Sequence, residues 1–269
     1  MVVKTDEMPR QDPDDPPLEY YFSTRRVTDP ILIRLCQSLR YQVYCKERSF
    51  LDPHQYPDQI EYDEFDQIAW HFATIARRSL ELAGTVRIVP YTRSLGLPIS
   101  QHCEIWPRYD PARLLKNDRE LGKIAEISRL AISRAFRRRQ FDDFYGDTKL
   151  AKSTAAANGI LPHERRAPSR PLIVLGLYGA YYRECKYQGI EHWYAAMEPA
   201  LTRLLARFGI KMTRVGPDTD YYGNVAPYSA SVHDMETTLA EQNPKLLQEF
   251  ATGLEPHLLP ETLRSNQSR

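Results

Sequence analysis

The sequence contains no run of apolar residues long enough to cross a lipid bilayer. Its longest run, from residue 171 to 182, falls short of the ~20 residues that a membrane helix needs. The beginning of the sequence also lacks the basic and then apolar pattern of a secretory signal peptide. These absences predict a cytoplasmic protein and leave room only for a peripheral contact with a membrane.

The sequence contains few cysteines and has almost no net charge. The four cysteines form no CxxC pair and have no histidine-rich segment beside them, so we expect free thiols in a reducing compartment and no metal site. Lys and Arg number 36 and Asp and Glu 35, which gives a net charge of +1. This balance argues against a nucleic-acid-binding module that relies on a broad basic surface.

The remaining composition is that of an ordinary globular domain. Hydrophobic residues make up 42% and charged residues 26% of the 269 residues. Residues 1–18 are rich in proline and aspartate and predict a disordered tail. We expect a single domain over 19–240, with a polar insert at about 140–170, and a polar C-terminal tail over 241–269.

Helical and strand patterns alternate along the predicted domain. Asp29 can cap a helix that begins at Pro30. Apolar spacing predicts helices at 30–46, 171–186 and 199–208. Branched and aromatic residues predict strands at 69–77, 82–90, 123–133, 190–197 and 210–215, and residues 216–228 read as an aromatic loop. This order predicts an α/β (α+β) sandwich on a mixed sheet.

The strand at 123–133 contains two charged residues, Glu126 and Arg129. A buried ion costs several kcal/mol unless it is paired, so the two predict either a functional site or a structural ion pair. Side chains alternate faces along a regular strand, and positions three apart point to opposite sides. If both residues serve one site, the strand must contain a bulge near residues 127–130.

Other charged residues can be interpreted either as solvent-exposed or as functional. Arg40 lies on the first helix and reads alone as a solvated residue, and Arg87 sits inside the second hairpin strand. The acidic run at 58–66 reads alone as a solvated turn. Four elements nevertheless occur in one order along the chain: Arg40 with Tyr44, the Glu61, Asp63 and Asp66 box, Gly84 with Arg87 and Pro90, and Glu126 with Arg129. With these elements the chain resembles the acyl-homoserine-lactone synthases and the long-chain N-acyl amino acid synthases, which are branches of the GNAT-like acyltransferases.

The C-terminal half narrows the resemblance. The HWYAAMEPAL junction, the GP-x-x-DYYG-x-x-APY loop and an earlier FLDP-x-x-YPD segment are similar to acyltransferases associated with exosortase (PEP-CTERM) systems. Two departures stand out: Phe50 lies where lactone synthases have a tryptophan, and the polar insert has no counterpart in the shorter enzymes. These departures put a homoserine-lactone product in doubt.

The resemblance implies a GNAT-like fold, a mixed twisted sheet with splayed central strands flanked by helices. It implies an N-acyltransferase that moves a long-chain acyl group from an acyl carrier protein (ACP) or CoA thioester to an amino acid or similar amine, without a tightly bound cofactor or metal. Glu126 is the first choice for the base and Glu61 the second. An ion network is expected from Arg40, Asp63, Asp66, Arg87 and Arg129, and acyl or pantetheine contacts from Ile132, Arg137, Trp193 and Tyr194.

Two alternatives to this enzyme stay open, namely a catalytically inactive sensor that binds an acyl chain or its carrier, and a homoserine-lactone synthase. The residues at 137–139 are three arginines that would either dock an acidic carrier protein or form a solvated loop. Five aromatic residues would either line an acyl pocket or, for most of them, pack in the core: Trp193, Tyr194, Tyr178, Tyr181 and Tyr182.

Overall fold

The computed structural model describes residues 16–114, 122–137 and 171–267. The N-terminal tail predicted for residues 1–18 lies mostly outside the described residues, as does the whole polar insert predicted at 140–170. Leu18, at the end of that expected tail, is buried in the main core.

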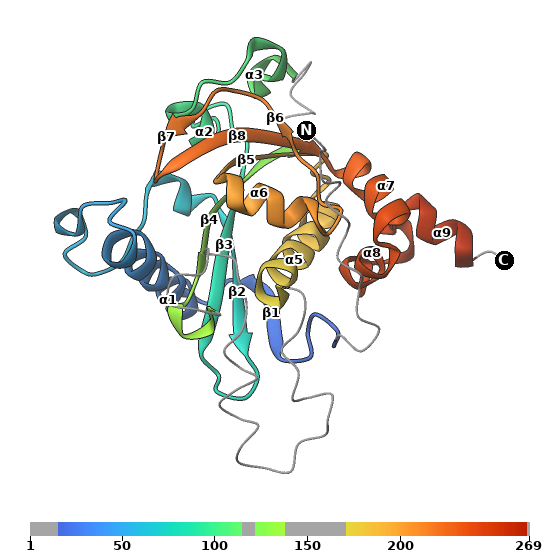
Figure 1. The fold of residues 1–269 in the computed structure, drawn as a ribbon, viewed down its shortest axis with the longest axis horizontal. Helices are drawn as coiled ribbons and strands as arrows, with labels where there is room; N and C mark the ends of the chain where they lie inside the picture. Colours follow the sequence, from blue (N-terminus) through green and yellow to red (C-terminus); the bar gives the residue numbers. More distant parts are fainter. Residues whose placement is uncertain (1–15, 115–121, 138–170, 268–269) are drawn as a thin grey trace, which may run out of the picture.

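The described residues form one mixed eight-stranded sheet in the order β1-β2-β3-β4-β5-β8-β6, with β7 paired to β8 (Figure 1). Only β4 and β5 pair in parallel, and the other neighbours are antiparallel. The strands are β1 (Phe22–Val27), β2 (Trp70–Ala76), β3 (Leu82–Pro90), β4 (Ile124–Ile132), β5 (His192–Met197), β6 (Thr213–Arg214), β7 (Thr219–Asp220) and β8 (Asn224–Ser231). The expected mixed α/β sheet of the GNAT-like class is confirmed.

Helices cover both faces of this sheet. Gly84 and Thr85 are consecutive on β3, so they face opposite sides. A Cβ at Gly84 would lie 2.7 Å from Ile173 of α5, whereas Thr85 interacts with Cys36 of α1 on the other face. The helices are α1 (Pro30–Tyr41), α2 (Pro98–His102), α3 (Pro111–Leu114), α5 (Leu172–Gln188), α6 (Pro199–Ala206), α7 (Val232–Gln242), α8 (Pro244–Ala251) and α9 (Glu261–Gln267).

The first predicted helix is confirmed, and it ends in a π-helical turn. The Asp29 side chain accepts a hydrogen bond from the Leu32 N–H at 2.9 Å, as an N-cap does. After α1 the chain continues as a π-helical turn over Gln42–Glu47. Such turns are rare and occur often at functional sites. This turn carries Tyr44, and Arg48 follows directly after it.

Three parts of the sequence-based assignment are corrected. Strand β1 was not predicted. The predicted loop at 216–228 contains β7 and most of β8. The segment after residue 241, expected as a polar tail, forms α8 and α9, and α8 packs on α5. The α8 side chains Leu246, Leu247 and Phe250 are fully buried in the main core, so this segment is an integral part of the fold.

Strand β4 contains the predicted bulge. Thr85 pairs with Ala131, but Arg87 pairs with Ser128, so β4 has one residue more than β3 over this interval. Arg129 lies in the bulge with φ of 56°, a left-handed conformation that costs energy in a residue with a Cβ. The extra residue changes the alternation of the side chains beyond it.

Strands β4 and β5 part shortly after they meet. Their parallel pairing covers Ile124 with His192, Ala125 with Trp193 and Glu126 with Tyr194. Beyond these pairs β4 continues along β3 to Ile132, and β5 continues along β8 to Met197. Beyond Glu126, β4 and β5 are no longer paired with each other. The main-chain N–H and C=O groups on their facing edges are therefore not used in a ladder between the two strands. This splay opens the sheet at its centre.

Candidate active site

Three arginines and three carboxylates form a compact network on the α1 face of the sheet. Arg40 of α1 donates to Glu61 and makes a two-pronged contact with Asp66, Nη1 to Oδ1 at 2.6 Å and Nη2 to Oδ2 at 2.9 Å. Arg87 of β3 binds both oxygens of Asp63, at 2.5 and 2.9 Å, and Asp66 Oδ2 at 2.7 Å. Such forked contacts fix direction as well as distance.

Arg129 joins this network from the bulge of β4. Its Nε donates to Glu61 Oε1 at 3.0 Å and its Nη2 to Asp63 Oδ2 at 3.0 Å. The network thus ties α1, β3 and β4 to the segment at 61–66. Three positive and three negative side chains balance in it, which offsets the cost of burying them. The five residues predicted to form an ion network all lie here.

Asp63 and Asp66 also give the acidic segment its local shape. Asp63 Oδ1 accepts from the Phe65 N–H, and Asp66 Oδ2 accepts from the Asp63 N–H, so the two residues form a capping box around a short 3₁₀ turn, Glu64–Gln67. The same carboxylates then accept from arginines of the sheet. The acidic run is therefore a folded support rather than a solvated turn.

Glu61 is wholly buried between two guanidinium groups. Burial alone would raise the pKa of its carboxyl, but Arg40 and Arg129 outweigh burial and hold the pKa below its ordinary value. Burial likewise opposes the ionisation of Asp66, and its hydrogen bonds and charge contact with Arg40 again lower its pKa. A carboxylate held ionised by two arginines is poorly suited to accept a proton.

Glu126 has the opposite environment. It lies on β4 with 1% of its surface exposed, and its Oε2 accepts a hydrogen bond of 2.6 Å from the Ile99 N–H at the start of α2. Burial raises the pKa of Glu126 to about 8, against the smaller opposing effects of this N–H and of Arg87. The carboxyl is thus poised to exchange a proton near neutral pH, as a general base must.

A pair of tyrosines at the turn between β7 and β8 closes one side of the site. The Arg129 Nη1 donates to the Tyr221 hydroxyl at 3.3 Å, and its Nη2 donates to the Tyr222 hydroxyl at 2.9 Å. Tyr222 has φ of 54° and Gly223 has φ of 99°. A Cβ at Gly223 would lie 2.9 Å from the Phe50 ring, so this turn rests directly on Phe50. We call residues 221–223 the tyrosine tip.

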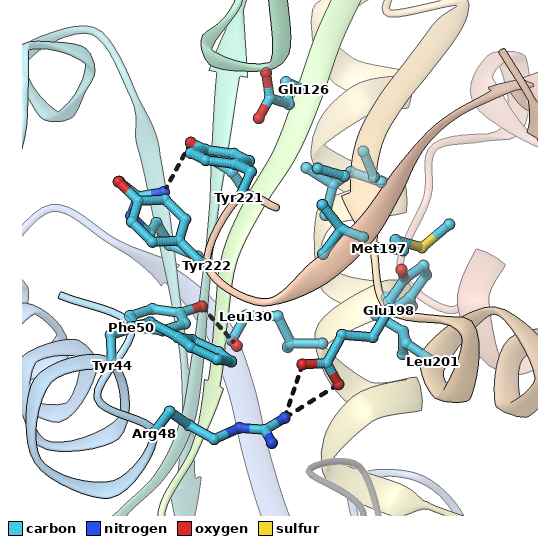
Figure 2. A pocket seen from close by; sticks show the side chains of 17 residues that line it. Tyr44, Arg48, Phe50, Glu126, Leu130, Met197, Glu198, Leu201, Tyr221 and Tyr222 are labelled. Atoms are coloured by element: carbon cyan, nitrogen blue, oxygen red, sulfur yellow. Dashed lines mark hydrogen bonds and ion pairs between the residues drawn. The ribbon is translucent and has the colours of Figure 1, made fainter. Parts of the chain in front are cut away.

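A cleft occupies the splay between β4 and β5 (Figure 2). It encloses about 720 Å³, its open mouth included. Glu126 lies at one end and Glu198 with Arg48 at the other, and the tyrosine tip lies along the side between them. The lining includes residues 127–130 of β4, 195–197 of β5, Tyr44, Phe50, Tyr178, Leu201 and Val225. A largely apolar cleft with a few polar groups is the usual form of a small-molecule site.

Two ion pairs from adjacent residues cross the mouth of the splay. Arg48 Nη2 donates to both oxygens of Glu198, at 2.8 and 3.1 Å, and Glu198 directly follows β5. Glu47 pairs with Arg137, which follows the end of β4. The end of the π-helical turn thus links the chain beyond both diverging strands.

The residues predicted to contact the acyl group or pantetheine lie outside the lining of the cleft. Ile132 and Trp193 are buried in the core beneath α5, where Trp193 packs edge-on against Tyr181 at 5.1 Å. Tyr194 points to the other face and donates to the Tyr109 carbonyl at 2.7 Å. Arg137 is 8% exposed and paired with Glu47, so it offers no surface for docking, and Arg138 and Arg139 lie outside the described residues.

The cleft lining includes residues that were not predicted as site residues, among them Tyr221, Tyr222, Arg48 and Glu198. Tyr221 and Tyr222 belong to the DYYG motif, whose consecutive aromatics beside a glycine could have indicated them. Arg48 and Glu198 gave no comparable signal, because their pairing joins segments 150 residues apart. Phe50 contacts Tyr44 in a stacked arrangement with 6.5 Å between the rings.

Within the described ranges, no group of three or more His, Cys, Asp and Glu side chains is arranged to hold a metal ion. All four cysteines are buried and unpaired. The described helices also include none that is long and apolar enough to span a bilayer.

Comparison with known proteins now adds to this geometry. Residues 39–145 match a family model described as an acetyltransferase (GNAT) domain. The part of the chain that contains the ion network and Glu126 is thus similar to a GNAT acetyltransferase domain. The prediction that the protein is an enzyme is thereby confirmed. No curated protein sequence matches the chain.

Solved structures share the fold of this acyltransferase at low sequence identity. FeeM, an N-acyl amino acid synthase from uncultured soil microbes, is 16% identical with a TM-score of 0.52, covering 82% of this chain and 96% of FeeM. BjaI with MTA, a CoA-dependent acyl-homoserine lactone synthase, is 18% identical with a TM-score of 0.54, covering 84% of this chain and 89% of BjaI. These likenesses confirm the GNAT-like fold.

Proposed function

We propose that this acyltransferase moves a long-chain fatty acyl group from the thioester of an acyl carrier protein or CoA to the amine of an amino acid or a similar acceptor. The observation that carries the proposal is the position of Glu126, a buried carboxyl with raised pKa at one end of a cleft opened by the strand splay. FeeM and BjaI, which share the fold, are named for acyl transfer of this kind.

The proposed reaction assigns a task to each part of the cleft. Glu126 takes a proton from the acceptor's ammonium group, directly or through a water, so that the neutral amine can attack the thioester carbonyl. A C–N bond forms and the C–S bond breaks. The nitrogen loses a second proton as the amide forms. One of the two protons is taken up by the departing thiolate and the other passes to solvent, so ammonium and thioester give an amide, a free thiol and one proton.

Main-chain groups in the splay supply the remaining chemistry. Beyond Glu126, β4 turns backbone groups toward β5 without pairing to it, so N–H groups there can donate to the developing oxyanion. The thioester arm lies in the same splay, and the apolar residues Leu130, Met197 and Leu201 contact its hydrocarbon part. The ion network holds this arrangement and takes no part in proton transfer, and Glu61 is assigned to that supporting role.

The direct test is an assay with purified protein. Long-chain acyl thioesters of carrier protein and of CoA are incubated in parallel with a pool of amino acids, and products are identified by mass spectrometry. An additional reaction contains S-adenosylmethionine as acceptor, because the BjaI structure holds SAM. An N-acyl amino acid supports the proposal, whereas a lactone product would replace it. Thioester binding without any acylated amine would favour a sensor on the same fold.

Glu126→Gln tests the assigned base. The amide has nearly the same shape and can still accept the Ile99 N–H, but it cannot take a proton. We expect kcat to fall by about 10²- to 10⁴-fold, the range that general-base catalysis supplies, with thioester binding retained. Tyr62→Phe, on a side chain that is 61% exposed, serves as the matched control and should keep full activity. Full activity of Glu126→Gln would remove Glu126 from the mechanism.

A further inference from the structure

The short helix α2 contacts both the candidate base and the tyrosine tip. The Ile99 N–H of its first turn donates to Glu126 Oε2 at 2.6 Å. Three residues later, the His102 ring stacks on the Tyr221 ring with centroids 4.2 Å apart and planes inclined by 14°. The first turn of α2 therefore meets Glu126 through its main chain, and the last residue of α2 meets the tyrosine tip through its side chain.

The tyrosine tip depends on contacts of this kind for its conformation. Tyr222 and Gly223 are consecutive left-handed residues, and a left-handed tyrosine persists only when its surroundings hold it there. Arg129 binds both tyrosine hydroxyls on the buried side, and the Tyr221 and Tyr222 rings lie 4.3 Å apart. His102 covers the outer side of Tyr221 and is itself exposed to solvent.

We propose that His102 is a positioning residue, which holds Tyr221 as the wall of the acceptor side of the cleft beside Glu126. This inference rests on the proposed function. Tyr221 is the labelled aromatic side chain drawn nearest to Glu126 in Figure 2, and the acceptor amine must approach Glu126 to lose its proton. The hydrocarbon part of the thioester is assigned to Leu130 and Leu201, which line the cleft, whereas His102 does not line it.

The charges around His102 favour its neutral form. Partial burial of the otherwise exposed ring and then the positive charge of Arg129 on β4 lower the pKa of His102, while Asp63 of the acidic segment raises it by a smaller effect. Tyr221, the residue it faces, has a pKa raised by burial, so its hydroxyl stays protonated. The contact is therefore a stack of two neutral rings near pH 7, and a phenyl ring can replace the imidazole.

A pair of variants separates this role from a merely structural one. His102→Phe keeps a flat ring on Tyr221 and should leave the KM of the acceptor within about twofold of wild type. His102→Ala removes the ring and should raise that KM by about three- to tenfold, the size expected for one lost ring stack, with the KM of the thioester unchanged. Gln101→Ala, on the exposed neighbour in α2, is the control and should change neither value.

Hydrogen exchange at the tip gives a readout that needs no turnover. The Tyr221 N–H is bonded to the Gly223 carbonyl at 3.0 Å, so exchange of peptides covering 219–225 reports whether the tip is held. His102→Ala should speed this exchange several-fold, and His102→Phe and Gln101→Ala should not, with exchange in α5 equal in all variants. Equal exchange in wild type and His102→Ala, or a rise in the thioester KM alone, overturns the proposal. If the wild-type protein makes no product, the proposed function is refuted. The exchange measurement then still tests whether His102 holds the tyrosine tip.

Discussion

Arg129 and Glu126 lie three residues apart on β4, yet both line the same cleft. A regular strand would place them on opposite faces, and the bulge at Arg129 removes that difference. Their electrostatic states differ sharply. Arg129 is fixed as a cation by Glu61 and Asp63, whereas Glu126 is neutral for much of its time near pH 7 because burial raises its pKa to about 8.

The raised pKa of Glu126 predicts a pH dependence of stability. Its folded-state pKa of about 8 exceeds the ordinary value of 4.5. The stability that this neutral carboxyl contributes is therefore fully present below about pH 4.5 and is lost as pH rises through 8. Glu126→Gln has no such loss. We expect the melting temperature of Glu126→Gln relative to wild type to rise between pH 5 and 8 and to level off above it. A constant difference across this range would contradict the raised pKa.

Removing Arg129 should destabilise the fold. Arg129→Ala leaves Glu61 and Asp63 without one of their cationic partners, and breaking a buried ion pair typically costs about 3–5 kcal/mol. Urea unfolding should show this loss as a lower midpoint. Arg34→Ala, on the exposed side of α1, should change stability by no more than about 0.5 kcal/mol. An unchanged midpoint for Arg129→Ala would refute the supporting role of the network.

Gly223→Ala tests the contact between the tyrosine tip and Phe50. The added Cβ would lie 2.9 Å from the Phe50 ring at a backbone φ of 99°, so the tip must move or strain. We expect kcat/KM to fall by about tenfold, a loss of about 1.4 kcal/mol in transition-state binding. Gly253→Ala has a similar φ of 85° but no atom within 4 Å of its Cβ. It measures the cost of backbone strain alone and should keep full activity. Equal activity of both variants would show that the tip contact is unimportant.

The C-terminal helices should be required for stability. Phe250 of α8 is fully buried and packs against Tyr182 of α5, with ring centroids 5.9 Å apart. Phe250→Ala should cost about 3–5 kcal/mol, as other buried Phe-to-Ala changes do. Gln248→Ala on the exposed side of α8 is the control. A melting temperature equal to wild type for Phe250→Ala would show that the packing of α8 on α5 does not stabilise the fold.

The sequence predicted those parts of the site whose energetic cost can be recognised within a short segment of the chain. A glutamate and an arginine inside an apolar strand had to be paired or functional, and their spacing required a bulge. The capping signals at Asp29 and Pro30 and the alternating pattern of the hairpin identified α1, β2 and β3 in the same way. Each of these signals comes from a few neighbouring residues.

Pairings between distant segments could not be predicted in this manner. Strand β1 carries two arginines in six residues, which obscured its pattern, and β8 contains Pro227, a residue that normally excludes a central strand. The Pro227 carbonyl accepts a hydrogen bond from the Val215 N–H at 2.9 Å, just past the end of β6. The missing N–H of Pro227 therefore faces this end of the β6 edge and takes nothing from the ladder with β5. For Trp193 and Tyr194 the strand was predicted, but the direction of each side chain depends on neighbours that the sequence does not reveal.

Because β4 and β5 pair over only three residues, the cleft between them forms only after β5 has joined the sheet. The sheet consists of two leaves joined along three residue pairs, one leaf from the first 132 residues and one from residue 192 onward. The cleft exists only between the leaves. A chain still being synthesised, or one truncated before β5, contains all six residues of the charged network but no place for a substrate. Substrate binding is therefore a property of the completed fold and reports that both leaves have assembled.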